Sequence, residues 1–258
     1  CVTPLNLYYD NVNQMTEMIE VNRMFGAQKF VFYNHSSGQR VQTLMESYME
    51  EGFLEVIPWD LPPTPGAEIH YFAQLAALND CLYKNIHKSK YIVFSDLDEL
   101  IVPRSHETWQ QLLAELHELH DLQRTTSFLF RCAFFKTEWP DDDVMARNHK
   151  VKALRPLTLL KTKRERKVWM AGMRSKYIAV PERVDTVGVH MVLKYRAYHD
   201  SEDDLVVPEQ LGLLHHYRFW NDPQDTNWMV DKSMHRFSGY IIRRVKERLH
   251  RVRLIEFR

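Results

Sequence analysis

Hydrophobic and polar positions in the first hundred residues predict strands and helices in alternation. Met15, Met18, Ile19 and Phe25 stand at helical spacing, and Gly26 follows where a helix would end. The predicted elements are strands at 2–9, 29–33, 54–57 and 90–94 and helices at 15–25, 41–49 and 69–86. This alternation predicts right-handed crossovers and a parallel sheet, with ligands bound beyond the carboxyl ends of its strands.

The second half of the chain has a looser pattern. Trp109 and the leucines up to Leu119 form one apolar stripe, which predicts a helix with Ser105 as its N-cap. Strands are expected at 127–135, 177–180 and 187–193, and a basic helix from about Met229. The length of 258 residues favours one large α/β domain.

The composition excludes several classes of protein. With 45% hydrophobic and 26% charged residues the chain is neither collagen-like nor disordered. Lys and Arg (34) balance Asp and Glu (34), so no basic surplus supports a nucleic-acid partner. The eight isolated glycines form no dinucleotide, P-loop or hydrolase-elbow motif. No apolar run approaches the roughly 18 residues of a membrane span, so a membrane anchor is expected only outside this chain.

The three cysteines are too few and too scattered for a zinc site or a disulfide-rich scaffold. Cys1, Cys81 and Cys132 allow one disulfide at most. The sequence leaves the pairing open.

Two Asp-x-Asp pairs occur, and their contexts differ. About one such pair is expected by chance, so the spacing alone identifies no site. Asp141 and Asp143 lie in an expected loop, where both are solvated. Asp96 and Asp98 follow a predicted strand, and a period of two turns both carboxylates to the same side. A divalent cation shared with substrate phosphates makes such a pair tolerable; the alternative is a strand end whose acids accept backbone N–H groups.

Residues 90–104 (KYIVFSDLDELIVPR) resemble the Asp-x-Asp region of glycosyltransferase family 92. Further segments resemble this family in the same order along nearly the whole chain, at 20–34, 57–59, 73–82, 181–185, 189–190 and 216–218. The resemblance implies a GT-A fold, an α/β domain with a Rossmann-like mixed, mostly parallel sheet and flanking helices. It places a nucleotide-sugar-binding half at 1–135 and an acceptor-binding half at 136–258 of a single catalytic domain.

The resemblance also implies a metal-dependent inverting galactosyltransferase. Its donor would be UDP-galactose or another UDP-sugar, and its acceptor an oligosaccharide such as an N-glycan. Asp98 is expected to ligate Mn²⁺, and Asp96 to share the metal or hold the ribose. A histidine ligand is expected at His216, which ends an apolar run, with His190 and His215 as alternatives.

The remaining site residues are less sharply defined by the resemblance. The nucleotide is expected to contact Thr3, Pro4, Leu5, Asn34, Gln74 and Asp96, and its diphosphate Arg218 and Lys232. The sequence does not identify the catalytic base that would deprotonate the acceptor hydroxyl, and the candidates are Glu138, Asp142 and Asp185. Trp139, Trp169 and Trp220 are either sugar-stacking or core residues. By resemblance the parent protein is a type II membrane protein of the Golgi lumen, whose N-terminal anchor is absent here.

Two other functions are compatible with the sequence. Residues 96–100 also resemble the first motif of haloacid-dehalogenase-like phosphohydrolases, in which an Asp is the nucleophile. Leu100 stands where those enzymes have Thr, and their motif normally opens the first strand, although Asp203-Asp204 could imitate their later acidic pair. The second alternative is a non-catalytic sugar-binding module with a GT-A-like fold.

Overall fold

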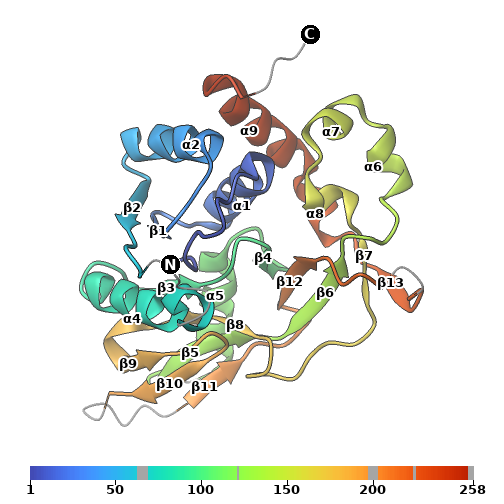
Figure 1. Cartoon of the computed structure of the whole chain (residues 1–258). Coiled ribbons are helices and arrows are strands. Elements are labelled where there is room, and N and C mark those ends of the chain that lie inside the picture. The colour runs from blue at the N-terminus through green and yellow to red at the C-terminus, as the bar shows by residue number, and fades with distance from the viewer. Residues whose placement is uncertain (63–68, 121, 197–202, 223–224, 255–258) are drawn as a thin grey trace.

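The computed structural model describes residues 1–62, 69–120, 122–196, 203–222 and 225–254, which form one mixed α/β domain (Figure 1). Helices α1, α2 and α9 lie side by side on one side of the strands, and β9, β10 and β11 lie at the opposite end of the molecule. No helix among the described residues is both long and apolar enough to cross a membrane.

Helices and strands alternate in the first half of the chain. In order it contains α1 (Val12–Phe25), β1 (Phe30–Asn34), α2 (Gln39–Glu50), β2 (Leu54–Pro58), the 3₁₀ turn η1 (His70–Ala73), α4 (Gln74–Asn85) and β3 (Ile92–Phe94). Strands β1 and β2 pair in parallel. Gly26 ends α1 with a left-handed φ of 112°, which a residue with a side chain rarely adopts. These helices and strands confirm the sequence prediction to within a few residues, except that η1 precedes α4.

The N-terminal segment lies between β1 and β3. Val2 N–H donates to Val31 O (3.1 Å), and Leu5 N–H donates to Tyr33 O (2.8 Å). On the other side, Thr3 N–H donates to Ser95 O (3.4 Å). The predicted strand at 2–9 is reduced to isolated parallel bridges at Val2, Leu5 and Tyr9.

Antiparallel pairing continues the sheet beyond β3. Strand β8 (Lys176–Ala179) lies between β3 and β5 (Thr125–Phe130) and is antiparallel to both, and β11 (Asp203–Val206) pairs with β5 in parallel. The strand order is therefore β11-β5-β8-β3. The predicted mixed α/β sheet is confirmed: among the described strands, β1–β2, β5–β11 and β6–β12 pair in parallel, and the other ladders are antiparallel.

A second sheet carries the segment that follows Asp98. Its order is β4-β12-β6, from β4 (Glu99–Pro103), β12 (Gly212–Arg218) and β6 (Cys132–Lys136). The other elements are α5 (Trp109–Leu119), α6 (Asp143–Arg147), α7 (His149–Leu154), α8 (Leu157–Leu160), β7 (Lys163–Glu165), η2 (Pro181–Arg183), β9 (Val184–Val187), β10 (Val192–Tyr195), β13 (Trp228–Val230), η3 (Ser233–Phe237) and α9 (Ser238–Arg251).

Several sequence predictions in the second half are wrong in detail. The expected strand at 127–135 is two strands, because the chain leaves one sheet at Arg131 and enters the other. The expected strand at 187–193 spans the two arms of the β9–β10 hairpin. Met229 lies in β13, and the basic helix begins at Ser238. Thr108 caps α5 in place of Ser105, whose hydroxyl donates to Gln210 O.

One apolar core joins both halves of the chain. It includes Phe32 of β1, Ile101 of β4, Phe134 of β6, Leu214 of β12 and Ile241 of α9. This shared core makes the chain a single domain, whereas the functional division at residue 135 stays a prediction.

Cys1 and Cys81 form a disulfide with a Cα–Cα distance of 6.1 Å. The bond ties the N-terminal segment to α4. Cys132 is free and buried in β6.

Candidate active site

The turn between β3 and β4 brings Asp96 and Asp98 to the edge between the two sheets. Asp96 N–H donates to the carboxylate of Glu99 (3.1 Å), and Glu99 N–H donates back to Asp96 O (3.3 Å). Because these residues form a turn, the strand period of two does not apply to them. The two carboxylates lie against different partners, Asp96 against Gln74 and Lys176 and Asp98 against His216.

Strand pairing places His216 beside Asp98. Strand β12 runs antiparallel to β4 with His216 opposite Glu99 and His215 opposite Leu100, and Tyr217 N–H donates to Asp98 O (2.8 Å). Nε2 of His216 then lies 3.2 Å from Oδ2 of Asp98. The two residues are 118 positions apart, so only the fold brings them together.

The Asp98–His216 contact changes the acidity of both groups. Burial raises the pKa of Asp98, but the hydrogen bond and charge of His216 outweigh burial and hold that pKa below its usual value. Burial lowers the pKa of His216, but the hydrogen bond to Asp98 and the charge of Glu99 raise it above 6.5. The pair therefore favours a carboxylate facing an imidazole that binds protons readily.

Glu99 and Lys176 form a buried ion pair behind the turn. Lys176 begins β8, and its side chain is only 1% exposed. Its Nζ lies 3.3 Å from Oε2 of Glu99 and 3.3 Å from Oδ2 of Asp96, and it donates to Val189 O (3.2 Å). Burial raises the pKa of Glu99 to about 7 against the opposing charge of Lys176. Burial lowers the pKa of Lys176, but the charges of Glu99 and Asp96 raise it overall.

Asp96 is held by two side chains from different elements. Gln74, the first residue of α4, donates to its Oδ1 (3.4 Å), and Lys176 donates to its Oδ2 (3.3 Å). The sequence predicts Asp96 and Gln74 in the same site, and the structure brings them into contact. Their expected contact with a nucleotide stays a prediction.

The residues around Asp98 suit a divalent cation completed by substrate. No three His, Cys, Asp or Glu side chains of the described residues form a ready metal cluster. Neighbouring ligands of an octahedral ion with bonds of about 2.1 Å lie about 3 Å apart, close to the 3.2 Å between Nε2 of His216 and Oδ2 of Asp98. Ions of this kind are held by one or two protein ligands together with substrate phosphates. Asp98 and His216 therefore fit the predicted pair of Mn²⁺ ligands.

The two alternative histidines lie in other places. His215 is buried on the opposite face of β12, where its ring stacks on Phe135 (4.3 Å between centroids). His190 lies near Asp96, because Val189 O binds Lys176 and His190 Nδ1 contacts Ser175 O (3.2 Å). Burial and the charge of Lys176 lower the pKa of His190. Of the three histidines, only His216 contacts Asp98.

Four of the residues expected to contact the nucleotide, Thr3, Pro4, Leu5 and Asn34, lie together in the N-terminal segment and at the end of β1. Pro4 and Leu5 are buried. Thr3 N–H donates to Ser95 O, and Leu5 forms a parallel backbone bridge with Asn34. Oδ1 of Asn34 is buried and has no hydrogen-bond partner in the described part of the chain, which fits a polar atom that a ligand would satisfy.

The two expected diphosphate contacts differ in their surroundings. Arg218 is exposed at the end of β12, with its guanidinium 5.1 Å from the centre of the Trp220 ring. Lys232 forms an ion pair with Asp142 (2.8 Å) and is already engaged there.

The three candidate bases also differ in the groups that contact them. Asp142 caps α6 and pairs with Lys232, and Asp185 on β9 pairs with Lys194 (3.1 Å). Both therefore have structural partners. Glu138 accepts hydrogen bonds from Trp220 N–H (3.1 Å) and Asp222 N–H (3.3 Å). It thus lies beside the segment that follows His216, and which of the three acts as base stays a prediction.

An aromatic cluster extends from His216 towards the surface. Phe134 of β6 lies opposite His216, with 4.8 Å between the ring centres. Trp220 and Trp169 pack edge-on against Phe134 at 5.0 and 5.8 Å, and Trp220 is 38% exposed. Trp139, by contrast, is only 2% exposed and belongs to the core.

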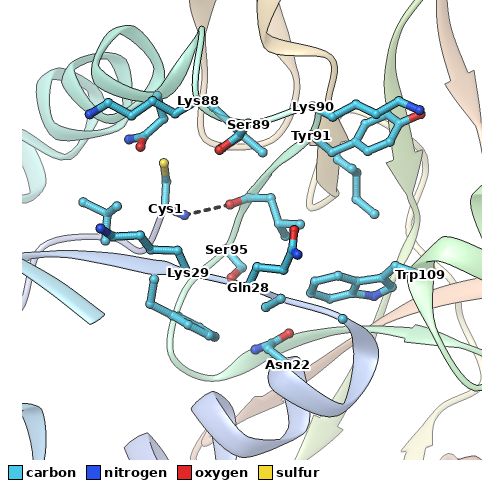
Figure 2. Close-up of a pocket in the computed structure, with 18 of the residues that line it drawn as sticks. Cys1, Asn22, Gln28, Lys29, Lys88, Ser89, Lys90, Tyr91, Ser95 and Trp109 are labelled. Atoms are coloured by element: carbon cyan, nitrogen blue, oxygen red, sulfur yellow. Dashed lines mark hydrogen bonds between the residues drawn. The ribbon is translucent and has the colours of Figure 1, made fainter. Parts of the chain in front are cut away.

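A cavity of about 340 Å³ lies at the other ends of the strands (Figure 2). Its walls include Lys29 before β1 and Lys90 and Tyr91 before β3, and the amino group of Cys1 donates to Val93 O beside it. None of the site residues predicted from the sequence lines this cavity. The turn 96–98 between β3 and β4, called the acidic turn below, is therefore a different place from this cavity.

Comparison with known proteins identifies the family of this chain. The sequence profile of glycosyltransferase family 92 matches residues 1–253. Glycosyltransferase family 92 protein F13G3.3 of Caenorhabditis elegans is 27% identical over 113 residues, which cover 40% of this chain and 22% of that protein. Beta-1,4-galactosyltransferase galt-1 of the same organism is 33% identical over 98 residues, which cover 37% of this chain and 22% of that protein. The aligned segments are thus a minor part of these relatives.

Among solved structures, residues 1–349 of TarS from S. aureus align with 70% of this chain and 46% of that chain, with 12% identity and a TM-score of 0.33. That value is too low to support a conclusion about the fold. The profile match, in contrast, covers nearly every residue. The chain belongs to glycosyltransferase family 92.

Proposed function

We propose that this chain is the catalytic domain of a Mn²⁺-dependent inverting glycosyltransferase, which moves galactose from UDP-galactose to a hydroxyl group of a glycan acceptor. The observation that carries the proposal is the contact between Asp98 and His216 at the carboxyl end of β3. Family membership supports glycosyl transfer, and the name of the relative galt-1 supports galactose.

In this proposal the residues of the acidic turn have separate tasks. Asp98 and His216 hold the cation, which when bound acts as a Lewis acid towards the leaving diphosphate. Asp96 is fixed by Lys176 and Gln74, so that its carboxylate has a defined position for accepting a hydrogen bond from the ribose. Asn34 offers its unpaired Oδ1 to the nucleotide.

The acceptor is proposed to lie on the aromatic side of His216. Trp220 presents an exposed ring there, and Glu138 lies next to it. Inversion requires direct displacement at the anomeric carbon, with a carboxylate that removes the acceptor's proton. Glu138 is the candidate base best placed for this step, because Asp142 and Asp185 are paired with lysines.

We place the parent protein in the Golgi lumen as a type II membrane protein, attached by an anchor outside this chain. The disulfide between Cys1 and Cys81 supports this proposal, because such bonds persist in oxidising compartments.

The test is UDP release from a panel of UDP-sugars with Mn²⁺ or with a chelator. We compare the intact chain with Asp98→Asn and with Asp143→Asn, which changes an exposed residue of the other Asp-x-Asp pair. We expect release from UDP-galactose that needs Mn²⁺ and falls on the order of 100-fold in Asp98→Asn only, because a lost metal ligand weakens transition-state stabilisation by several kcal/mol.

Calorimetry on the same samples separates a slow enzyme from a wrong proposal. UDP bound together with Mn²⁺, but without release, indicates that the acceptor is missing from the assay or that the module is non-catalytic. If neither binding nor release occurs, the proposal fails. The phosphohydrolase alternative predicts phosphate release without a sugar donor, and its later acidic pair is not at the site, because Asp204 lies on β11 with β5 and β8 between it and β3.

A further inference from the structure

Glu99 directly follows Asp98 at the start of β4, and its side chain contacts Asp96, Lys176 and His216. Its side chain is 2% exposed. Oε2 accepts the N–H of Asp96 (3.1 Å) and lies 3.3 Å from Nζ of Lys176. Oε1 lies 3.2 Å from Nδ1 of His216. The two oxygens therefore connect the Asp96 turn and β8 on one side to β12 on the other.

Strand register fixes the contact between Glu99 and His216. The two residues are direct partners in the antiparallel β4–β12 ladder, so their side chains leave the same face of the sheet side by side. Nδ1 of His216 is buried and forms no well-aligned hydrogen bond with the described residues, and Oε1 of Glu99 is the acceptor beside it. The imidazole is thus placed between two carboxylates, with Asp98 at Nε2 and Glu99 at Nδ1.

This placement separates the tasks of the two ring nitrogens. A histidine that ligates a metal through one nitrogen commonly donates its other N–H to a carboxylate, which fixes the ring and its tautomer. We propose that Glu99 is the positioning residue of this site, which orients His216 through Nδ1 and holds the turn that carries Asp96 and Asp98. The inference rests on the proposed function.

Lys176 is the counter-ion that allows Glu99 to act in this way. A buried carboxylate without a partner is strongly unfavourable, and Lys176 provides a buried positive charge at 3.3 Å. Lys176 also binds Asp96, so one cation neutralises the inner side of the acidic turn. The outer side, with Asp98 and Nε2 of His216, is left for a ligand.

The test compares Glu99→Gln with Glu17→Gln by titrating Mn²⁺ into each protein in the presence of UDP. Glu17 is a matched control, because its buried carboxylate also accepts hydrogen bonds, from Leu157 N–H (2.8 Å) and Thr158 N–H (2.9 Å), but lies outside the site. We expect Mn²⁺ affinity to fall about 10- to 100-fold in Glu99→Gln, as for other supporting partners of a metal ligand. It should not change in Glu17→Gln, although both variants lose thermal stability.

A folded Glu99→Gln that binds Mn²⁺ as tightly as the intact chain overturns the inference and leaves the proposed function in place. An intact chain that binds no Mn²⁺ with UDP overturns the proposed function itself. If Glu99→Gln does not fold, ¹⁵N NMR of the intact chain with UDP and Mg²⁺ decides, with His216 assigned by His216→Gln. A His216 ring with its proton on Nδ1 is the expected result, and a proton on Nε2 overturns the inference.

Discussion

His215 and His216 are neighbours in the chain with opposite surroundings. His216 faces Asp98 and Glu99, whereas His215 is buried beside Phe135 and Tyr217. Burial lowers the pKa of His215 to about 3; the charge of Asp231 opposes this shift, and the charges of Arg104 and Arg164 add to it. One step along β12 thus separates a histidine that can serve a site from one that stays neutral in the core.

The stability of the protein should depend on pH through His215. Its folded-state pKa lies below the unfolded value of 6.5, so below pH 6.5 the unfolded chain binds a proton that the folded chain excludes. Stability is therefore complete above about pH 6.5 and falls as pH drops towards 3. Between pH 7 and pH 5 we expect the intact chain to lose about 2 kcal/mol more than His215→Gln, as measured by urea unfolding. Equal losses of stability in both proteins would contradict the lowered pKa of His215.

Lys176 and Glu99 should be strongly coupled in stability. Lys176→Met leaves the buried Glu99 carboxylate without its counter-ion, so we expect it to lower the free energy of unfolding by about 3 kcal/mol at pH 8. Lys176→Met combined with Glu99→Gln should cost less than the sum of the single changes, because no unpaired charge remains. Denaturant unfolding of the four proteins measures this coupling. Strict additivity would show that the two side chains do not stabilise each other.

Among the elements, helices were easier to predict than strands. Apolar periodicity locates α1, α2 and α5, because each buries one stripe of side chains against the core. The stretch 127–135 is apolar on both sides of Arg131, and β5 and β6 are both fully buried, so the pattern does not show that the two strands belong to different sheets. The strands that pair in a sheet can lie far apart in the sequence, so local periodicity does not identify them.

The same limit applies to the site residues. Asp96 and Asp98 are predicted from their place after an apolar strand and from the resemblance to a family, and His216 from that resemblance and the apolar run before it. Glu99 and Lys176 were missed, although each is a charged residue beside an apolar strand, with Leu100-Ile101-Val102 after one and Tyr177-Ile178-Ala179 after the other. A charged residue next to a buried strand indicates a buried ion pair, but its partner is identified only by how β8, β3 and β4 pack together.

The N-terminus of α5 offers a test at the scale of one element. The hydroxyl of Thr108 accepts the N–H of Gln111, and the side chain of Gln111 accepts the N–H of Thr108. Thr108→Ala should therefore lower the free energy of unfolding by about 1 kcal/mol. Ser105→Ala, at the N-cap expected from the sequence, removes only an exposed hydrogen bond to Gln210 O and should cost less. Thermal unfolding of both variants ranks them, and the reverse order would mean that Ser105 is the effective cap.

At the scale of the whole molecule, the acidic turn depends on segments that meet from across the chain. The turn follows β3, His216 comes from β12, Lys176 from β8, and Gln74 from α4. Such a site is assembled only when both sheets are in place. The two halves of the chain therefore each supply part of this cluster.

The disulfide holds the N-terminal part of this assembly together. Cys1 and Cys81 are separated by 80 residues. Linking them lowers the conformational entropy of the unfolded chain, which for a loop of this length stabilises the folded state by about 4 kcal/mol. The bond joins the segment between β1 and β3 to α4, whose first residue contacts Asp96. Cys81→Ser should therefore lower the melting temperature by on the order of 10 °C.

Reductant distinguishes loss of the disulfide from loss of packing around Cys81. Dithiothreitol should lower the melting temperature of the intact chain to that of Cys81→Ser and leave Cys81→Ser itself unchanged. Cys132→Ala is the control, because Cys132 is buried and free, so this variant should remain as sensitive to reductant as the intact chain. If reductant leaves the intact chain unchanged, the bond contributes little to stability. If it destabilises Cys81→Ser equally, the effect of reductant comes from elsewhere in the molecule.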